Sequence, residues 1–262
     1  IHPQSRFSRL LVLRLVRNMD PVTGAIRLQN GEELPVDEAD VGMVLGIPRG
    51  CKKISCGMPV SQSHVAKVKA SLMIKQGKEI TLTYLEKILV KDYGLKMSTR
   101  EREAFKVAAV LYADAYFLAP KGAKAKVNQD LLIYVSEPAF IEGFNWCGYV
   151  LQVLIDSTRR AQEALRVGET KVTLDGYLFF WLVYYIDNVD FEGKNSTQEV
   201  LPRVMDFPYT VVKELVGDDK CRTGLEGVAS FGQNKLRPSN DVIYSRNKKI
   251  NSRGDKIRNM LK

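Results

Sequence analysis

The chain has little histidine and no long apolar run, and each shortage excludes a class of protein. Only two histidines occur among 262 residues, so a site built on several imidazoles is excluded. The longest strongly apolar run, residues 177–186, is about half of the ~20 residues that a transmembrane helix needs. No G-x-G-x-x-G phosphate-binding motif occurs. These shortages exclude a bilayer-spanning helix and a dinucleotide-binding fingerprint.

The four cysteines, residues 51, 56, 147 and 221, follow no secretory signal. This predicts reduced thiols in an intracellular, reducing compartment, nuclear or cytoplasmic, and an unused glycosylation sequon at Asn195. The chain starts at Ile1, so we expect a segment upstream. Residues 5–19 are rich in Arg and Ser and carry no acid, which is typical of a mitochondrial presequence or of an amphipathic first helix. We favour the helix, because presequences lie at the true N-terminus.

The composition predicts a soluble globular protein, but the net charge of +9 is unevenly distributed. Residues 235–262 carry nine Lys or Arg against two Asp, which is +7 and leaves +2 for residues 1–234. Such a tail can contact nucleic acid or an acidic protein. The candidate contact residues are Arg246, Lys248, Lys249, Arg253, Lys256 and Arg258.

The pattern of apolar residues predicts a mainly α fold, a single multi-helix domain with a small β-hairpin near the N-terminus. The hairpin joins residues 25–29 to residues 32–36 through Asn30-Gly31, and Pro35 restricts its second strand to an edge. Asp37 is expected to cap the next helix, and Ser98 with Glu101 to cap another that buries Phe105.

Two further helices are expected, near residues 144–165 and within residues 172–190, the second apolar on nearly every side and so central in the core. A basic loop at residues 121–126 is the best candidate for an internal boundary. Residues 1–234 then form the helical module, and residues 235–262 the basic tail.

Three blocks of sequence together resemble a plant protein family. They are "LRLVRNMDPVTGAIRLQNGEELPVDEADVGMVLGIPRG", "FNWCGYVLQVLIDSTRR", and "DGYLFFWLVYYIDNVDF" with "LPRVMDFPY" downstream. In this order they are similar to the plant mobile domain and its relatives in grass genomes. The resemblance implies a transposon-derived protein, in some cases nuclear, with no catalytic residues to carry over. It therefore favours a binding or assembly module, and an "aminotransferase-like" label sometimes given to relatives implies no activity here.

Cys147-Gly148 resembles the nucleophile of SUMO-specific cysteine proteases, which some relatives of the plant mobile domain carry as a joined domain. A cysteine hydrolase needs a base beside the thiol, and His64 is the one plausible base. The glutamine that such proteases place before the cysteine is missing from "PAFIEGFNW". The hydrolase is therefore kept as an alternative, with Cys147 interpreted as part of a core helix.

Other chemistries have weaker signals. Cys51, Cys56 and His64, with Cys221, could hold zinc, but a second close pair of ligands is missing. "GIPRGCKK" lacks the spacing and the Ser/Thr of a P-loop. Asp187 and Asp190 are expected to be solvated turn residues after the apolar helix.

The sequence thus predicts a non-enzymatic protein–protein interaction or assembly module, with no cofactor and no metal. The alternative is a nucleic-acid-binding protein that uses the basic tail. The cysteine hydrolase is a third hypothesis. The partner is expected to be another protein, and nothing in the sequence indicates an oligomeric state.

Overall fold

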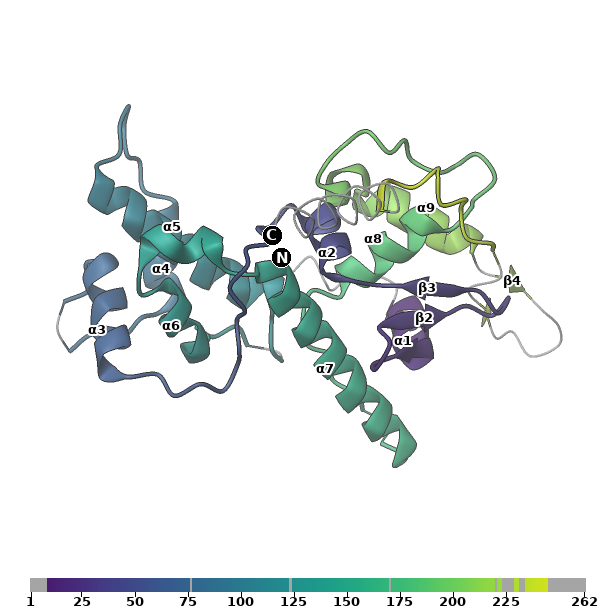
Figure 1. Ribbon diagram of the computed structural model, residues 1–262, viewed down its shortest axis with the longest axis horizontal. Helices are drawn as coiled ribbons and strands as arrows, with labels where there is room; N and C mark the ends of the chain where they lie inside the picture. Colours follow the sequence, from purple (N-terminus) through teal and green to yellow (C-terminus); the bar gives the residue numbers. More distant parts are fainter. Residues whose placement is uncertain are drawn as a thin grey trace, which may run out of the picture. The chain divides into compact units, whose positions relative to one another are not determined.

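The computed structural model describes residues 9–75, 77–122, 124–169, 171–219, 221–222, 229–230 and 234–244. It is mainly α-helical with a small three-stranded sheet near the N-terminus, which confirms the predicted fold class (Figure 1). The chain separates into two compact units. Unit 1 comprises Ile1–Ile47, Ile155–Val172 and Leu178–Lys262, and unit 2 comprises Pro48–Leu154 and Thr173–Tyr177. Residues 121–126 lie inside unit 2.

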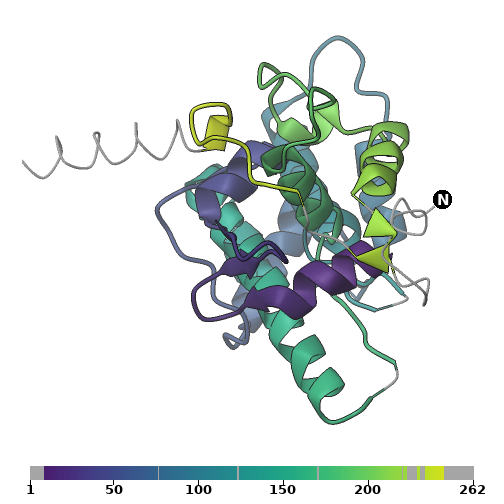
Figure 2. The same ribbon diagram turned by 90° about the vertical axis from the view of Figure 1, so that its right-hand side faces the viewer.

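Unit 1 begins with α1 (Arg9–Asn18) and a three-stranded antiparallel sheet, β1 (Met19–Asp20), β2 (Ala25–Arg27) and β3 (Glu33–Pro35). The predicted hairpin is β2 and β3, and Pro35 lies on an edge strand as expected. The strand β1 was not predicted, because two residues are too short to show an alternating pattern. Figure 2 shows these strands beside α1, in purple.

The core of unit 1 is the helix α8 (Phe179–Asn188), all ten residues of which are buried. It packs against α1, against α2 (Glu38–Leu45) and against α9 (Tyr209–Asp218). A short 3₁₀ turn, η5 (Arg203–Asp206), lies between α8 and α9 in the sequence and contacts α2 and α8. The two-residue strands β4 (Cys221–Arg222) and β5 (Ala229–Ser230) pair with each other.

Both predicted N-caps are confirmed. The Asp37 carboxylate accepts from the backbone of Ala39 and Asp40, and the Asp40 side chain accepts from Asp37 N, so α2 starts with a capping box. Ser98 and Glu101 form the same box at the start of α5. Each box satisfies backbone N–H groups that have no partner inside the helix.

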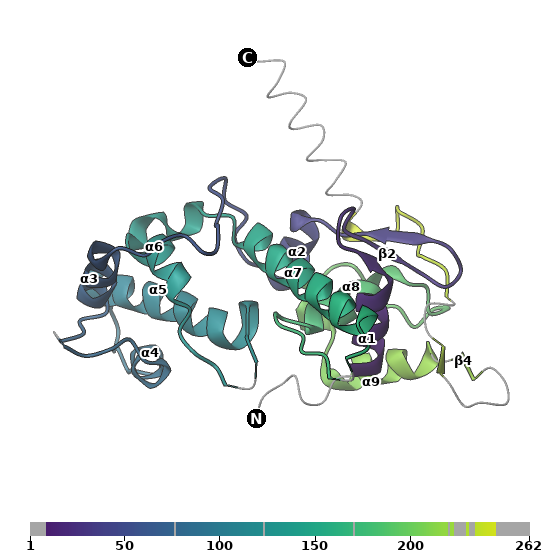
Figure 3. The ribbon, with the colours of Figure 1, turned by 90° about the horizontal axis from the view of Figure 1, so that it is seen from below.

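The long helix α7 (Trp146–Arg166) contributes its first half to unit 2 and its second half to unit 1. In unit 1 it runs beside α1 (Figure 3), and the Gln162 amide donates to the carbonyls of Val16 at 2.8 Å and Met19 at 2.6 Å. These bonds satisfy carbonyl groups at the C-terminal end of α1.

Unit 2 is built from helices. They are α3 (Gln62–Ser71), α4 (Leu82–Leu89), α5 (Thr99–Ala113), the π-helical turn η2 (Asp114–Leu118), η3 (Gln129–Leu131), α6 (Leu132–Val135) and η4 (Pro138–Gly143). The predicted burial of Phe105 on α5 is wrong, because its side chain is exposed. Its ring lies edge-to-face with Tyr93, with the ring centroids 6.3 Å apart.

Within the described ranges, no helix combines the length and the apolar character that crossing a bilayer requires.

Candidate interaction site

A buried ion pair joins α8 to η5 in unit 1. Arg203 has 0% of its surface exposed, and its guanidinium donates to both carboxylate oxygens of Asp187, from Nε at 2.8 Å and from Nη2 at 3.0 Å. Two parallel bonds of this kind fix the direction of both side chains. Burial acts to lower the pKa of Arg203, but the carboxylates of Asp187 and Asp206 outweigh it and raise that pKa.

Further hydrogen bonds surround the pair. Arg203 Nη1 donates to Asp206 Oδ2 at 2.6 Å and to the Val200 carbonyl at 3.0 Å. Asp187 also accepts from the Tyr244 hydroxyl at 2.7 Å and the Gln198 amide at 2.6 Å. Burial and the Asp187 charge raise the pKa of Tyr244, so this hydroxyl keeps its proton. We call the set Asp187, Gln198, Arg203, Asp206 and Tyr244 the arginine hub.

The hub corrects the expectation that Asp187 is a solvated turn residue. Asp187 lies in the last turn of α8 and is 1% exposed. Its charge is compensated by Arg203, sixteen residues further along, so the local sequence carries no sign of its burial. Asp190 is exposed and accepts from Glu192 N at 2.9 Å, as a turn aspartate would.

The backbone that the hub holds carries four exposed apolar side chains. We call them the apolar turn: Val200, Leu201, Met205 and Tyr209, which are 41%, 52%, 68% and 39% exposed. Arg203 ties the Val200 carbonyl to Asp206, and Ser196 Oγ donates to Asp206 Oδ2 at 2.8 Å. The segment is thus ordered by part-buried hydrogen bonds, while its four apolar side chains are exposed. Such a surface can bind an apolar surface at a reduced entropic cost.

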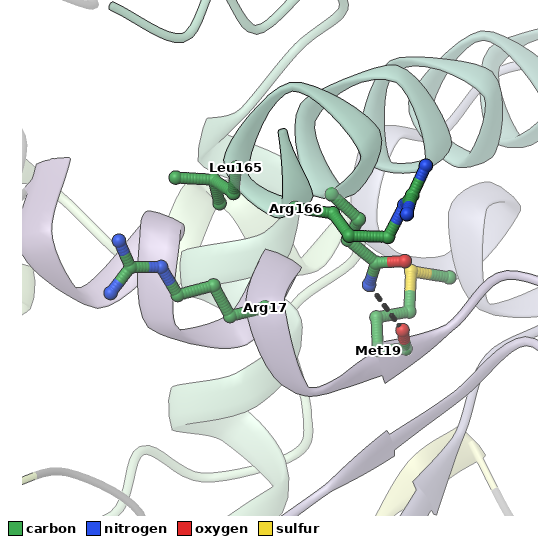
Figure 4. A pocket seen from close by; sticks show the side chains of 5 residues that line it. Arg17, Met19, Leu165 and Arg166 are labelled. Atoms are coloured by element: carbon green, nitrogen blue, oxygen red, sulfur yellow. Dashed lines mark hydrogen bonds between the residues drawn. The ribbon is translucent and has the colours of Figure 1, made fainter. Parts of the chain in front are cut away.

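An open pocket of about 600 Å³ lies between α1 and the end of α7 in unit 1 (Figure 4). Arg17, Met19, Gln162, Leu165 and Arg166 line it. The two guanidinium groups extend in opposite directions, and Arg166 forms an ion pair with Glu163 at 2.7 Å. The Gln162 amide already donates its hydrogen bonds to carbonyls at the end of α1. The two cations therefore do not converge on one ligand.

Unit 2 contains a second buried carboxyl group, Asp114, at the start of the π-helical turn η2. Its Oδ1 accepts from the Tyr149 hydroxyl at 2.7 Å, and Asn128 Nδ2 donates to that hydroxyl at 3.2 Å. Burial raises the pKa of Asp114 to about 6, although Tyr149, Lys121 and Asn128 act to lower it. Asp114 therefore changes charge in the pH range near 6.

Cys147 and His64, the residues of the hydrolase alternative, both lie in unit 2. Cys147 is 0% exposed on α7, and its thiol donates to the Pro48 carbonyl at 3.5 Å. The His64 ring forms a hydrogen bond at 3.0 Å with the Oγ of Ser61, which is the N-cap of α3. Each side chain thus has a local structural partner.

The cysteines considered for zinc lie at different kinds of position. Cys51 and Cys56 are exposed, and Cys221 begins β4. In the part of the chain that the structure describes, no group of three or more His, Cys, Asp or Glu is arranged to hold a metal ion. Asn195 of the sequon bonds the backbone, since its amide donates to the Val189 carbonyl at 2.6 Å and accepts from Phe191 N at 2.8 Å.

The tail candidates for nucleic-acid contact lie outside the described residues. They are Arg246, Lys248, Lys249, Arg253, Lys256 and Arg258. The last described residue before them is Tyr244, which the hub holds through Asp187.

The hub and the apolar turn were missed by residue-level reasoning from the sequence. Periodicity shows which residues can share a helical face, but residues 200–209 include an irregular stretch where no period applies. A usable signal was present in "LPRVMDFPY", where a single Arg lies among apolar residues. An arginine in that setting is either at the surface or paired inside the fold.

Residues 2–182 match the model of a family described as "Domain of unknown function (DUF8566)", and the chain belongs to this family. The match includes most of the described chain up to the middle of α8 and ends before the apolar turn. No curated protein and no solved structure matches the chain.

Proposed function

We propose that this member of the DUF8566 family is a non-enzymatic interaction module that binds a partner protein through the apolar turn. The observation that carries the proposal is the combination of a buried arginine hub with exposed apolar side chains on the backbone it holds. The hub orders this segment before any partner binds, and ordering a loop beforehand reduces the entropy lost on binding.

The chemistry of the apolar turn indicates the kind of partner. Met205 and Tyr209 are residue types enriched in protein interfaces, since methionine adapts to irregular surfaces and tyrosine offers a large rigid contact area. The exposed side chains of the turn carry no charge. We therefore expect a protein partner whose contact surface is apolar, and a complex that tolerates high salt.

The resemblance of the three sequence blocks to the plant mobile domain supports the same proposal. A transposon-derived assembly protein acts by holding other proteins together, and the basic tail is compatible with a nuclear location. Nucleic-acid binding through the tail is the second candidate function, favoured by its charge of +7. The hydrolase alternative requires Cys147 to react with a thiol-directed probe in the folded chain.

The proposal is tested by parallel pull-down experiments that use the full chain as bait. Wild type and the variant Leu201→Asp/Met205→Asp are used as baits for extract in 0.5 M NaCl, and the bound proteins are quantified by mass spectrometry. Leu95→Asp is the matched control, because Leu95 is a fully exposed leucine of unit 2. We expect at least one protein to be retained by wild type and the control and lost, by tenfold or more, with the double variant.

The affinity of the purified candidate partner for wild type and for the double variant is then measured. Equal binding to wild type and to Leu201→Asp/Met205→Asp would contradict the proposal. So would binding that disappears at 0.5 M NaCl, because that dependence would indicate an electrostatic contact.

A further inference from the structure

A second exposed surface, in unit 2, combines positive charge with aromatic rings. Lys52 Nζ lies over the Phe140 ring, 4.9 Å from its centroid, and 5.8 Å from the centroid of Phe144. Phe140 is 56% exposed, and Phe144 is half-buried. Arg49 and Lys53 are exposed on the same loop. We call Arg49, Lys52, Lys53, Phe140 and Phe144 the basic–aromatic platform.

The backbone of the platform is fixed. Gly50 N donates to the Phe144 carbonyl at 3.0 Å, Lys52 N to the Gly143 carbonyl at 3.1 Å, and Asn145 N to the Lys52 carbonyl at 2.7 Å. A Cβ at Gly50 would meet Gly143 O at 2.2 Å, so this close approach requires glycine. The loop continues to Ser55, whose backbone N–H and carbonyl both bond the Tyr134 hydroxyl.

The charge of the platform is not neutralised by its neighbours. Within the described residues, Arg49, Lys52 and Lys53 have no carboxylate partner. The nearby acids are already paired: Glu137 with Lys67 at 2.5 Å and Glu142 with Lys106 at 3.0 Å. Three cations on a rigid loop therefore remain available to an anionic ligand.

We propose that the basic–aromatic platform binds single-stranded nucleic acid, independently of the basic tail and of the apolar turn. The cations contact phosphates and the phenylalanine rings stack on bases, which is the combination that single strands require. An exposed cation–π contact contributes only about 0.5–1 kcal/mol, so Lys52 can turn to a phosphate and leave Phe140 to a base. A duplex offers the same phosphates but keeps its bases stacked internally, so it gains less from the rings.

The test measures binding of a fluorescent 20-nucleotide oligouridine to the full chain by anisotropy, with a duplex of equal length for comparison. The variant Lys52→Ala/Lys53→Ala is compared with Lys75→Ala/Lys78→Ala, which removes two exposed lysines elsewhere in unit 2. Loss of two phosphate contacts reduces the log–log salt slope by about 1.4, at about 0.7 per contact for single strands. We expect that reduction for the platform variant and none for the control.

The aromatic contribution is tested with Phe140→Ala. Loss of one stacked base weakens binding about fivefold or more. The control is Phe117→Ala, since Phe117 is another exposed phenylalanine of unit 2. We expect Phe140→Ala to weaken oligouridine binding and to abolish the preference of the protein for the single strand over the duplex.

Photocrosslinking of a 4-thiouridine oligonucleotide locates the contact independently of affinity. Crosslinks within residues 49–53 or 138–145 support the proposal. Crosslinks confined to residues 245–262, with unchanged affinity of both platform variants, would overturn it. Equal affinity for polyglutamate or for anionic vesicles, insensitive to Phe140→Ala, would also overturn it, because the surface would then recognise charge alone. If the apolar turn captures no partner protein, these measurements still decide whether the platform binds nucleic acid.

Discussion

Arg203 is a fully buried arginine that ties η5 to α8 in unit 1. A buried guanidinium is stable only where carboxylates and carbonyls replace the water it has lost. Asp187, Asp206 and the Val200 carbonyl supply that replacement. The same bonds set the course of the chain between α8 and α9, so one side chain contributes to stability and also shapes the exposed surface.

Arg203→Met should therefore destabilise the protein strongly. The substitution removes the two-bonded cation of the buried Asp187 carboxylate and leaves it, among the described cations, only Arg237 Nη1, at 4.0 Å. Breaking a buried ion pair in this way typically costs about 3–5 kcal/mol. The measurement is the free energy of unfolding in urea, followed by tryptophan fluorescence, since Trp181 is buried on α8. The control is Arg166→Met, which removes an exposed pair with Glu163 and should cost less than about 1 kcal/mol. Similar losses for both variants would contradict the role given to Arg203.

Asp114 should make the stability of unit 2 depend on pH. Its pKa is about 6 in the folded chain against 3.8 for an ordinary aspartate, so the folded state holds the proton more tightly. Stability from this group is therefore greatest at low pH and is lost as pH rises from about 4 to above 6. The difference corresponds to about 3 kcal/mol at 1.36 kcal/mol per pKa unit.

The test is Asp114→Asn, which cannot ionise but keeps a similar shape. The groups that face Asp114 are Tyr149, Asn128 and Lys121. The unfolding free energy of the variant, relative to wild type, should increase between pH 4 and pH 7. If the unfolding free energies of the two proteins changed with pH in parallel, the pKa of Asp114 would not be raised in the folded chain.

At the scale of elements, the starts of the two helices with predicted N-caps could be read from the sequence and the irregular segments could not. Asp37 and Ser98 cap their helices because a short polar side chain reaches the backbone a few residues ahead, which is a local rule. The burial of α8 followed from an apolar composition on every side. Local rules of this kind need no knowledge of the tertiary fold.

The features that the sequence did not predict correctly have a common physical origin. Phe105 is exposed because the buried face of α5 consists of Ala104, Val107, Ala108 and Leu111. Only packing partners distant in sequence decide which face of a helix is covered. The central contacts of the arginine hub join Asp187 to Arg203, sixteen positions apart, and to Tyr244, 57 positions apart. The platform joins residue 52 to residues 140 and 144. Neither contact is visible in a window of sequence.

Ser98→Ala should destabilise unit 2 by about 1 kcal/mol, since it removes the N-cap of α5. The Glu101 carboxylate, whose pKa is lowered to about 2 by Lys91 and Ser98, would keep its bond to Lys91. Urea unfolding measures the loss, and Ser98→Asp should restore the stability because aspartate caps equally well. A variant Ser98→Ala as stable as wild type would show that the capping box contributes little here.

At the scale of the whole molecule, the two proposed surfaces lie on different units. The apolar turn belongs to unit 1, and the basic–aromatic platform belongs to unit 2. The family model covers residues 2–182, so it includes the platform and ends before the apolar turn. We therefore expect variants of one surface to lose the binding proposed for it and to keep the binding proposed for the other.

The most direct test of the interaction module is amide hydrogen exchange of the full chain with and without the captured partner protein. We predict that the partner slows exchange in peptides covering residues 196–209, where the hub holds the apolar turn. Peptides of α3 and α4 in unit 2 should exchange at unchanged rates. Protection confined to other segments, with residues 196–209 exchanging as fast in the complex as in the isolated chain, would contradict the account.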